Sequence, residues 1–386
     1  MEYYDELRKF VAPEVVYGIG ARNMVGRYCE NLSSSKVMIV TDPGVIEAGW
    51  LNDITKSLEE MNLKYMVFDK VSQNPRIYEV MEGARIYSES NCDVIVSIGG
   101  GSPMDCAKGI GIVVSNGGHI LDYEGVDKIS SPIPPLIFIP TTAGSSADVS
   151  QFSIISNREE LIKFAIISKA IVPDVALIDP ETTVSMNGYL TACTGIDAMV
   201  HAIEALVSTA SSRITDIHAI EAIKLIWKYL KLTIDNPFDL ELRSKIMFAS
   251  MEAGFAFSNA ILGAVHAMSH SLGGLLDLPH GECNALLLDS VVDFNFLAVP
   301  EKFRIVADCF GISVEGLNDV EIKNEIINSI KFLKSETGVC RRLSDVGVKL
   351  SDIPDLAEKA MNDPCMITNP RVPVKRDIEV IFENAF

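Results

Sequence analysis

Histidine and aspartate residues at helical spacing mark the part of this chain where metal chemistry is expected. The chain holds only six histidines, and three of them, His266, His270 and His280, lie in one short stretch. His266 and His270 are four residues apart, as are Asp197 and His201. A spacing of four places two side chains on one face of a helix, where they can bind a cation together.

Spacing alone does not choose among these five residues, because several sets of three or four ligands are open. Imidazole and carboxylate ligands favour Fe(II), Zn(II) or Mn(II) over a thiolate-bound metal. The eight cysteines contain no CxxC pair, which indicates reduced thiols and a cytoplasmic protein. Structural or surface roles are predicted for His119 and His218, and Glu204 and Glu252 are predicted as helix-face charges rather than catalysts.

A glycine-rich turn is a candidate site for binding phosphate groups. Residues 92–102, CDVIVSIGGGS, combine a buried strand with the start of a helix. The three glycines Gly99, Gly100 and Gly101 allow close approach of a ligand, and Ser102 and Pro103 are expected as N-cap and first helical residue. The N–H groups of such a helix start can hold a diphosphate. A tight turn without a ligand is the alternative, since the pattern is not GxGxxG.

Two further strand ends support a nucleotide site. Asp42 follows one strand, where its carboxylate can accept hydrogen bonds from a ribose diol and repel a 2′-phosphate, which favours NAD over NADP. A turn-forming aspartate before Pro43 is the alternative. Residues 139–146, IPTTAGSS, end another strand with small hydroxyl residues. Parallel sheets bind ligands at the carboxyl ends of their strands, where all three loops would lie.

The elements that must position these residues divide the chain in two. In the first part, short β-rich runs alternate with helical stretches such as 75–90, which predicts a parallel sheet with helices on both faces. After Pro180 helical periodicity dominates. We expect an α/β dinucleotide-binding domain over 1–185 and an all-helical metal-binding domain over 186–386. The strands are expected at 36–42, 64–69, 92–102, 135–142, 163–168 and 173–180.

Composition narrows the classes of protein. The chain is 48% hydrophobic and 22% charged, as folded proteins with sizeable cores are. Its formal net charge is −19, so an acidic surface would repel nucleic acid. Charges or glycines interrupt the apolar runs, and no membrane span or secretory signal is predicted.

The motifs together fit one family. The chain resembles the iron-containing (group III) alcohol dehydrogenases over essentially its whole length. The matching stretches are GGGSPMDCAK, PTTAGSSADVS, TGIDAMVHAIEA, AVHAMSHSLGG and HGECNA. This resemblance implies a nucleotide-binding α/β domain followed by a helical domain, with the active site in the cleft between them. It also implies a cytoplasmic enzyme that forms dimers or larger homo-oligomers.

The resemblance assigns roles that spacing leaves open. The metal ligands of the family fall on Asp197, His201, His266 and His280. Its NAD-binding segments fall on Asp42, Gly99, Gly100, Gly101, Ser102, Thr141 and Thr142. His270 matches a histidine that lines the pocket beside the metal without being a ligand, and it is expected to relay a proton. The substrate-pocket wall falls on Phe152 and Phe257.

The implied reaction is hydride transfer between a small alcohol and NAD, with a divalent metal polarising the substrate oxygen. Fe(II) follows from the family, although the same ligands can bind Zn(II). Asp148, Glu282 and Cys283 depart from the usual pattern and leave the choice of alcohol open. The alternatives are a zinc-dependent polyol dehydrogenase, an enzyme of the dehydroquinate-synthase type, a metallohydrolase and an inert scaffold.

Overall fold

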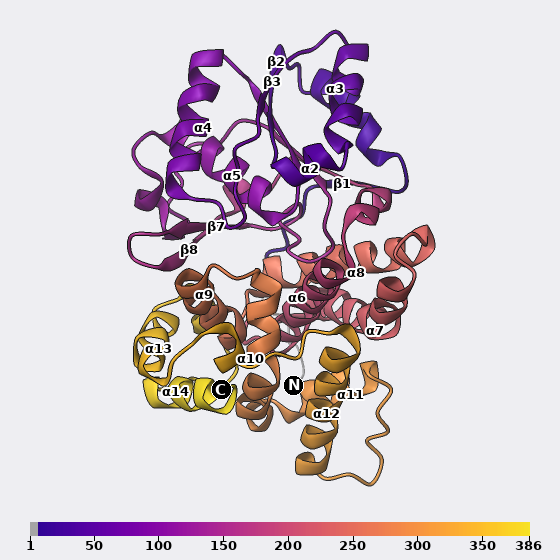
Figure 1. The fold of residues 1–386 in the computed structure, drawn as a ribbon, viewed down its shortest axis with the longest axis vertical. Coiled ribbons are helices and arrows are strands. Elements are labelled where there is room, and N and C mark those ends of the chain that lie inside the picture. The colour runs from indigo at the N-terminus through magenta and orange to yellow at the C-terminus, as the bar shows by residue number, and fades with distance from the viewer. Residues whose placement is uncertain (1–6) are drawn as a thin grey trace. The chain divides into compact units, whose positions relative to one another are not determined.

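The computed structural model describes residues 7–386, which form two compact units. One unit is Val11–Met186, and the other is Asn187–Phe386 together with residues 7–10 (Figure 1). Those few N-terminal residues were expected in the α/β domain. They join the helical unit because the ring of Phe10 stacks on His218, with centroids 5.6 Å apart.

The first unit is built on a six-stranded sheet in which every pair of neighbours is parallel. Its spatial order is β1-β9-β6-β4-β2-β3. The parallel sheet predicted from the β-rich runs is therefore confirmed. The strands are β1 (Glu14–Tyr17), β2 (Lys36–Val40), β3 (Lys64–Phe68), β4 (Val94–Gly99), β6 (Leu136–Pro140) and β9 (Val175–Ile178).

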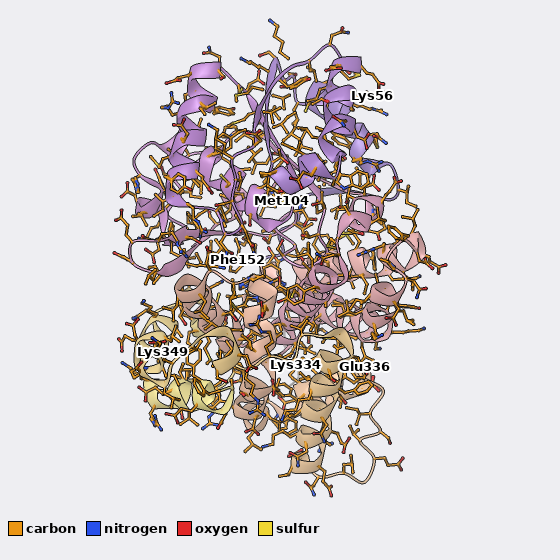
Figure 2. All side chains as sticks on the ribbon, viewed as in Figure 1. Lys56, Met104, Phe152, Lys334, Glu336 and Lys349 are labelled. Carbon is orange, nitrogen blue, oxygen red and sulfur yellow. The ribbon has the colours of Figure 1, made fainter. Side chains whose placement is uncertain are left out.

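Alternate residues of the central strands face two separate cores. In β2, Val37 and Ile39 pack into the core shared with Ile54 of α3, whereas Met38 and Val40 pack into the core on the opposite face. That second core contains residues of α4 and α5, and Met104 of α5, labelled in Figure 2, belongs to it. Both faces are thus covered by helices. The helices are α1 (Val25–Asn31), α2 (Pro43–Glu47), α3 (Trp50–Glu60), α4 (Ile77–Ser90) and α5 (Gly101–Asn116).

A smaller sheet lies outside the parallel one. It has the order β5-β8-β7, and β7 and β8 pair antiparallel. The strand expected at 163–168 is β8, so it forms a hairpin instead of extending the main sheet. A short turn after Asn157 allows the chain to reverse there directly, without a crossover helix. The strands are β5 (Gly125–Val126), β7 (Phe152–Asn157) and β8 (Ile162–Ile167).

The second unit is helical, and no strand occurs between 187 and 386. Its first helix, α6, is long and apolar enough to cross a membrane by composition alone, but 89% of its most apolar window is buried inside the protein. A helix that is hydrophobic all round is typical of a core. The helices are α6 (Gly188–Val207), α7 (Arg213–Asp235), α8 (Leu240–Ala260), α9 (Ala264–Leu276), α10 (His280–Asn295), α11 (Pro300–Cys309), α12 (Asp319–Thr337), α13 (Ile353–Met361) and α14 (Lys375–Asn384).

Candidate functional site

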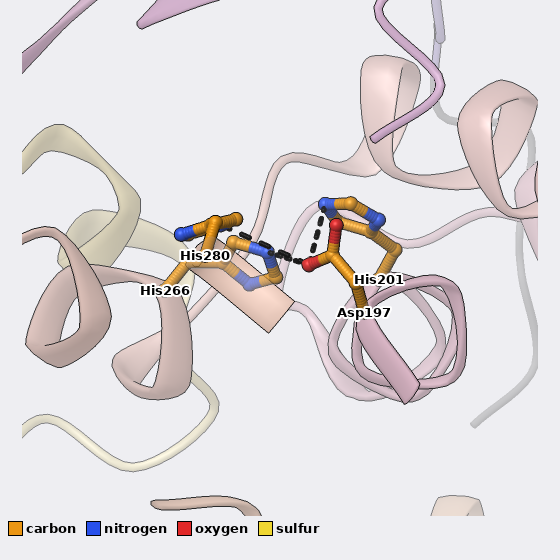
Figure 3. A group of neighbouring side chains, drawn as sticks. All are labelled: Asp197, His201, His266 and His280. Atoms are coloured by element: carbon orange, nitrogen blue, oxygen red, sulfur yellow. Dashed lines mark ion pairs between the residues drawn. The ribbon is translucent and has the colours of Figure 1, made fainter. Parts of the chain in front are cut away.

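Four side chains from three helices of the helical unit meet at one point. Helix α6 supplies Asp197 and His201 one turn apart, α9 supplies His266, and α10 begins at His280. One ligand atom of each lies within 4.8 Å of the others. The Oδ1 atom of Asp197 lies 4.0, 4.0 and 3.8 Å from the Nε2 atoms of His201, His266 and His280 (Figure 3). The structure therefore brings together the four residues that the family resemblance selects.

The spacing of these atoms fits a divalent cation. The three distances are too long for direct hydrogen bonds between Asp197 and the imidazoles. Atoms held about 2.1 Å from a central ion in a tetrahedral arrangement lie about 3.4 Å from one another, close to what is observed. Burial lowers the pKa of His266 well below its usual value, which favours the neutral ring, the form that binds metals. Three imidazoles and a carboxylate suit Fe(II) or Zn(II).

Glu204 supports this group from the same helix. It is buried, and its Oε2 lies 2.6 Å from Nδ1 of His266. Burial raises the pKa of Glu204 to about 7, while hydrogen bonds from the backbone of residues 263–266 oppose that rise. Glu204 was predicted as a helix-face charge rather than a catalyst, and the face of α6 that carries it is buried.

Asn284 is a second residue that sequence reasoning missed. It lies one turn after His280 on α10, and its Nδ2 donates to Oδ1 of Asp197 over 2.6 Å. The same Nδ2 lies 3.3 Å from Nε2 of His266 and 3.4 Å from Nε2 of His280. Its carboxamide therefore faces three members of the group. The spacing of four from a proposed ligand was the signal that could have found it.

His270 belongs to a different group, with Asp363 and Cys365. Its Nδ1 lies 2.7 Å from Oδ2 of Asp363, and its ring stacks on His280 with centroids 5.3 Å apart. Burial raises the pKa of the Cys365 thiol well above its usual value. A direct hydrogen bond joins His270 and Asp363, and the raised pKa keeps the Cys365 thiol neutral. This group is therefore a hydrogen-bonded network. The potential ligand atoms of the first group lie farther apart, at 3.8–4.0 Å from Oδ1 of Asp197.

The two predicted pocket residues lie in different units. Phe257 of α8 is buried, and its ring stacks on His201 with centroids 4.2 Å apart, so it braces a proposed ligand. Phe152 begins β7 in the α/β unit, where its carbonyl accepts from Nζ of Lys108 over 2.7 Å. A role for either ring in a substrate wall stays a prediction.

The predicted nucleotide turn joins β4 to α5, and three loops meet there. A Cβ on Gly99 would lie 3.2 Å from Oδ2 of Asp42, and one on Gly100 would lie 3.2 Å from the side chain of Thr142. Gly99 has a φ of +153°, which favours glycine. Asp42, Gly99 and Thr142 follow or end β2, β4 and β6, which are neighbours in the sheet. The backbone of Thr141 is bonded to this turn as well, through its N–H to the carbonyl of Gly99.

Ser102 does not cap α5 as predicted. The helix begins at Gly101 with Gly100 as N-cap, and the Ser102 hydroxyl accepts from the N–H of Asn74 over 3.1 Å. Glycine can adopt the cap conformation without a side chain, which lets the helix start earlier. No side-chain hydrogen bond caps this helix, and uncapped N–H groups at a helix start can bind an anion.

Asp42 shapes the turn before α2, which was the predicted alternative to ribose binding. It is the N-cap of α2, and its Oδ1 accepts from the N–H of Val45 over 3.1 Å. Burial raises the pKa of its carboxyl group, and the backbone hydrogen bonds oppose this. The cap engages Oδ1 while Oδ2 faces Gly99, so the two roles are compatible.

The residues that depart from the family pattern are all buried. Asp148 lies near Lys108, and burial raises the pKa of Asp148 to about 6. Glu282 forms an ion pair with Arg341 at 2.9 Å. Cys283 is buried and does not join the four-residue group. The ion pair with Arg341 compensates the charge of the buried Glu282 carboxylate.

His119 and His218, predicted to be structural or surface residues, each have a hydrogen-bond partner. His119 accepts from the N–H of Leu121 at a helix start. His218 pairs through Nδ1 with Glu252 at 2.6 Å. Glu252, predicted as a helix-face charge, is buried and paired with this histidine.

Comparison with known proteins decides the family. The family model described as iron-containing alcohol dehydrogenase matches residues 12–180, and that of the Fe-containing alcohol dehydrogenase C-terminal region matches residues 191–386. The chain belongs to the iron-containing alcohol dehydrogenase family. This member is therefore an oxidoreductase of the alcohol dehydrogenase type, as the motifs implied.

Its relatives match along nearly their whole length. The chain is 38% identical to the 1,3-propanediol dehydrogenase of Klebsiella pneumoniae, covering 98% of both chains. It is also 38% identical to the NAD-dependent methanol dehydrogenase of Bacillus methanolicus, covering 97% of this chain and 99% of the relative. A crystal structure of 1,3-propanediol oxidoreductase superposes with a TM-score of 0.95 at 37% identity, covering 99% of this chain and 100% of that one.

Proposed function

We propose that this family member is an NAD-dependent dehydrogenase that interconverts a small primary alcohol or diol with its aldehyde or ketone, using Fe(II). The observation that carries the proposal is the meeting of one carboxylate and three imidazoles at 3.8–4.0 Å around Oδ1 of Asp197. The relatives named for propanediol and methanol support small alcohols as the substrate class.

Each set of residues has a separate task in this proposal. Asp197, His201, His266 and His280 would hold the metal, and the turn at Gly99–Ser102, with Thr141 and Thr142, would hold the NAD diphosphate. When bound, the metal supplies a Lewis acid for the substrate oxygen and NAD supplies the hydride acceptor. Asp363 fixes Nδ1 of His270 by accepting its hydrogen, which leaves Nε2 to take up the alcohol proton.

The test is a substrate panel run on protein loaded with iron or with zinc. We expect NADH formation, followed by its absorbance, with small primary alcohols or diols, and faster turnover with Fe(II) than with Zn(II). Faster turnover with Zn(II) would favour the polyol type of enzyme. Hydrolysis of an ester or amide without NADH formation would contradict the proposal outright.

Asp42→Ser is expected to weaken discrimination against NADP. Serine keeps an oxygen that can cap α2, but it removes the charge that would repel a 2′-phosphate. The ratio of kcat/KM for NAD to that for NADP should fall by roughly tenfold or more, since like charges at close range cost several kcal/mol. Steady-state kinetics with both cofactors measures this ratio.

Asp239→Ser is the matched control for Asp42→Ser. Asp239 also caps a helix, α8, and lies in the helical unit, so its replacement changes the net charge equally. The cofactor ratio should stay at the wild-type value in this variant. An unchanged ratio in Asp42→Ser, or the same fall in both variants, would remove Asp42 from the cofactor site.

We also propose a cytoplasmic homodimer or larger homo-oligomer without a nucleic-acid or membrane partner. All eight cysteines are free, as in proteins from reducing compartments, and the net charge of −19 opposes nucleic-acid binding. Light scattering coupled to size exclusion would measure the assembly, and a monomeric mass would contradict it.

A further inference from the structure

Glu204 lies on the same face of α6 as two proposed ligands, three residues after His201 and seven after Asp197. It is 3% exposed and is not part of the four-residue group. Its Oε2 lies 2.6 Å from Nδ1 of His266, a residue 62 positions away on another helix. One helix face thus carries two ligands and a carboxylate that contacts a third.

Glu204 also replaces the missing cap of α9. The N-cap residue, Gly263, has no side chain to accept from the first turn. Instead, Oε1 of Glu204 accepts from the N–H of Val265 over 2.7 Å, and Oε2 faces the N–H of His266 at 3.4 Å. A Cβ on Gly263 would lie 2.9 Å from Oε1 of Glu204, so glycine is what lets the carboxylate reach the helix. The backbone and the ring of His266 are therefore held by one group.

These contacts fix which nitrogen of His266 carries the hydrogen. When Glu204 is ionised, both of its oxygens can only accept, so Nδ1 of His266 carries the hydrogen that bridges the 2.6 Å contact. Nε2 then keeps its lone pair, and this is the atom that faces Asp197. In known metal sites such a carboxylate orients its histidine and raises metal affinity.

We propose that Glu204 is a positioning residue that sets the ring orientation and tautomer of His266 and thereby the metal affinity of the site. The inference rests on the proposed metal site, but it concerns a residue outside the ligand set. The contact with His266 gives the buried Glu204 a polar partner, without which its charge would be costly.

Glu204→Gln separates this role from simple packing. Glutamine has the same shape, but one of its two terminal atoms is an NH2 group that cannot accept. Its oxygen must stay with Val265, whose N–H has no alternative partner on its own helix at that position. The NH2 group then faces Nδ1 of His266 and donates to it, which moves the ring hydrogen to Nε2 and removes the lone pair that a metal needs.

The experiment measures metal affinity of metal-free protein reloaded with Zn(II) or Fe(II) in competition with a chelator. Glu204→Gln should bind about 10- to 100-fold more weakly than wild type, the range seen when such a partner is lost. Glu252→Gln is the matched control, because Glu252 forms the same 2.6 Å contact with His218 outside the group. It should bind as wild type does.

Equal affinity in Glu204→Gln and wild type would overturn the inference, as would the same loss in Glu252→Gln. Absence of metal binding by wild type would instead contradict the proposed function. A measurement on the wild type covers the case in which the variant does not fold. Nitrogen NMR of metal-free protein labelled at histidine should show the hydrogen of His266 on Nδ1, and a hydrogen on Nε2 would overturn the inference.

Discussion

His266→Ala is expected to abolish metal retention and turnover while NAD binding is kept. The substitution removes one of the three imidazoles around Oδ1 of Asp197 and leaves Glu204 without its imidazole partner. Metal affinity should fall by more than about 100-fold, because loss of a supporting contact alone costs 10- to 100-fold. Elemental analysis gives the metal content, and quenching of protein fluorescence gives NAD affinity.

His218→Ala is the control for this prediction, since it removes a histidine of the same unit that pairs with Glu252. It should keep its metal. Metal content in His266→Ala equal to that of the wild type would refute the ligand assignment. Loss of NAD binding together with the metal would show instead that the substitution disrupts the protein more widely.

Gly281→Ala is expected to damage the site through packing. Gly281 follows His280, and a Cβ there would lie 2.1 Å from the carbonyl oxygen of Cys193 and 3.2 Å from Cβ of Asp197. Backbone of α6 cannot yield to such a contact, so α10 must shift and carry His280 away from Asp197. We expect a loss of roughly 3 kcal/mol in the free energy of unfolding and a parallel loss of metal affinity.

Gly188→Ala is the matched control, because a Cβ there meets only a side-chain carbon of Ile234 at 3.6 Å, an ordinary contact. Denaturant unfolding of the metal-free proteins compares the two variants, and chelator competition compares their metal affinity. Wild-type stability and affinity in Gly281→Ala would show that α10 does not depend on this close approach.

The fold of the first unit was predictable because its signals are local. Runs such as 36–42 and 64–69 are apolar and bounded by polar or turn residues, and they became β2 and β3. The strand with which a given strand pairs cannot be read from its own residues. Residues 163–168 have the same composition as the sheet strands, yet they pair with β7 in a hairpin. Phe10 likewise contacts a residue far along the chain.

The site was predictable only in part for the same reason. The spacing of four in His266 and His270 is identical to that in Asp197 and His201, so it cannot separate a ligand from a neighbour. In the structure His270 contacts Asp363, which is 93 residues away. The contact of Glu204 with His266 could not be predicted, because it joins residues 62 positions apart across two helices.

The burial of α6 also has a consequence for the order in which the helices are made and packed during synthesis. During synthesis this apolar helix emerges well before α10, the helix that carries the last proposed ligand. Until α7, α8 and α10 pack against it, α6 exposes a surface whose hydropathy matches that of a membrane-spanning helix. Such exposed apolar surfaces promote aggregation. A metal ion cannot shield it early, because two of the four ligands are not yet made. The apolar surface of α6 is therefore covered only when the later helices of the same unit pack against it.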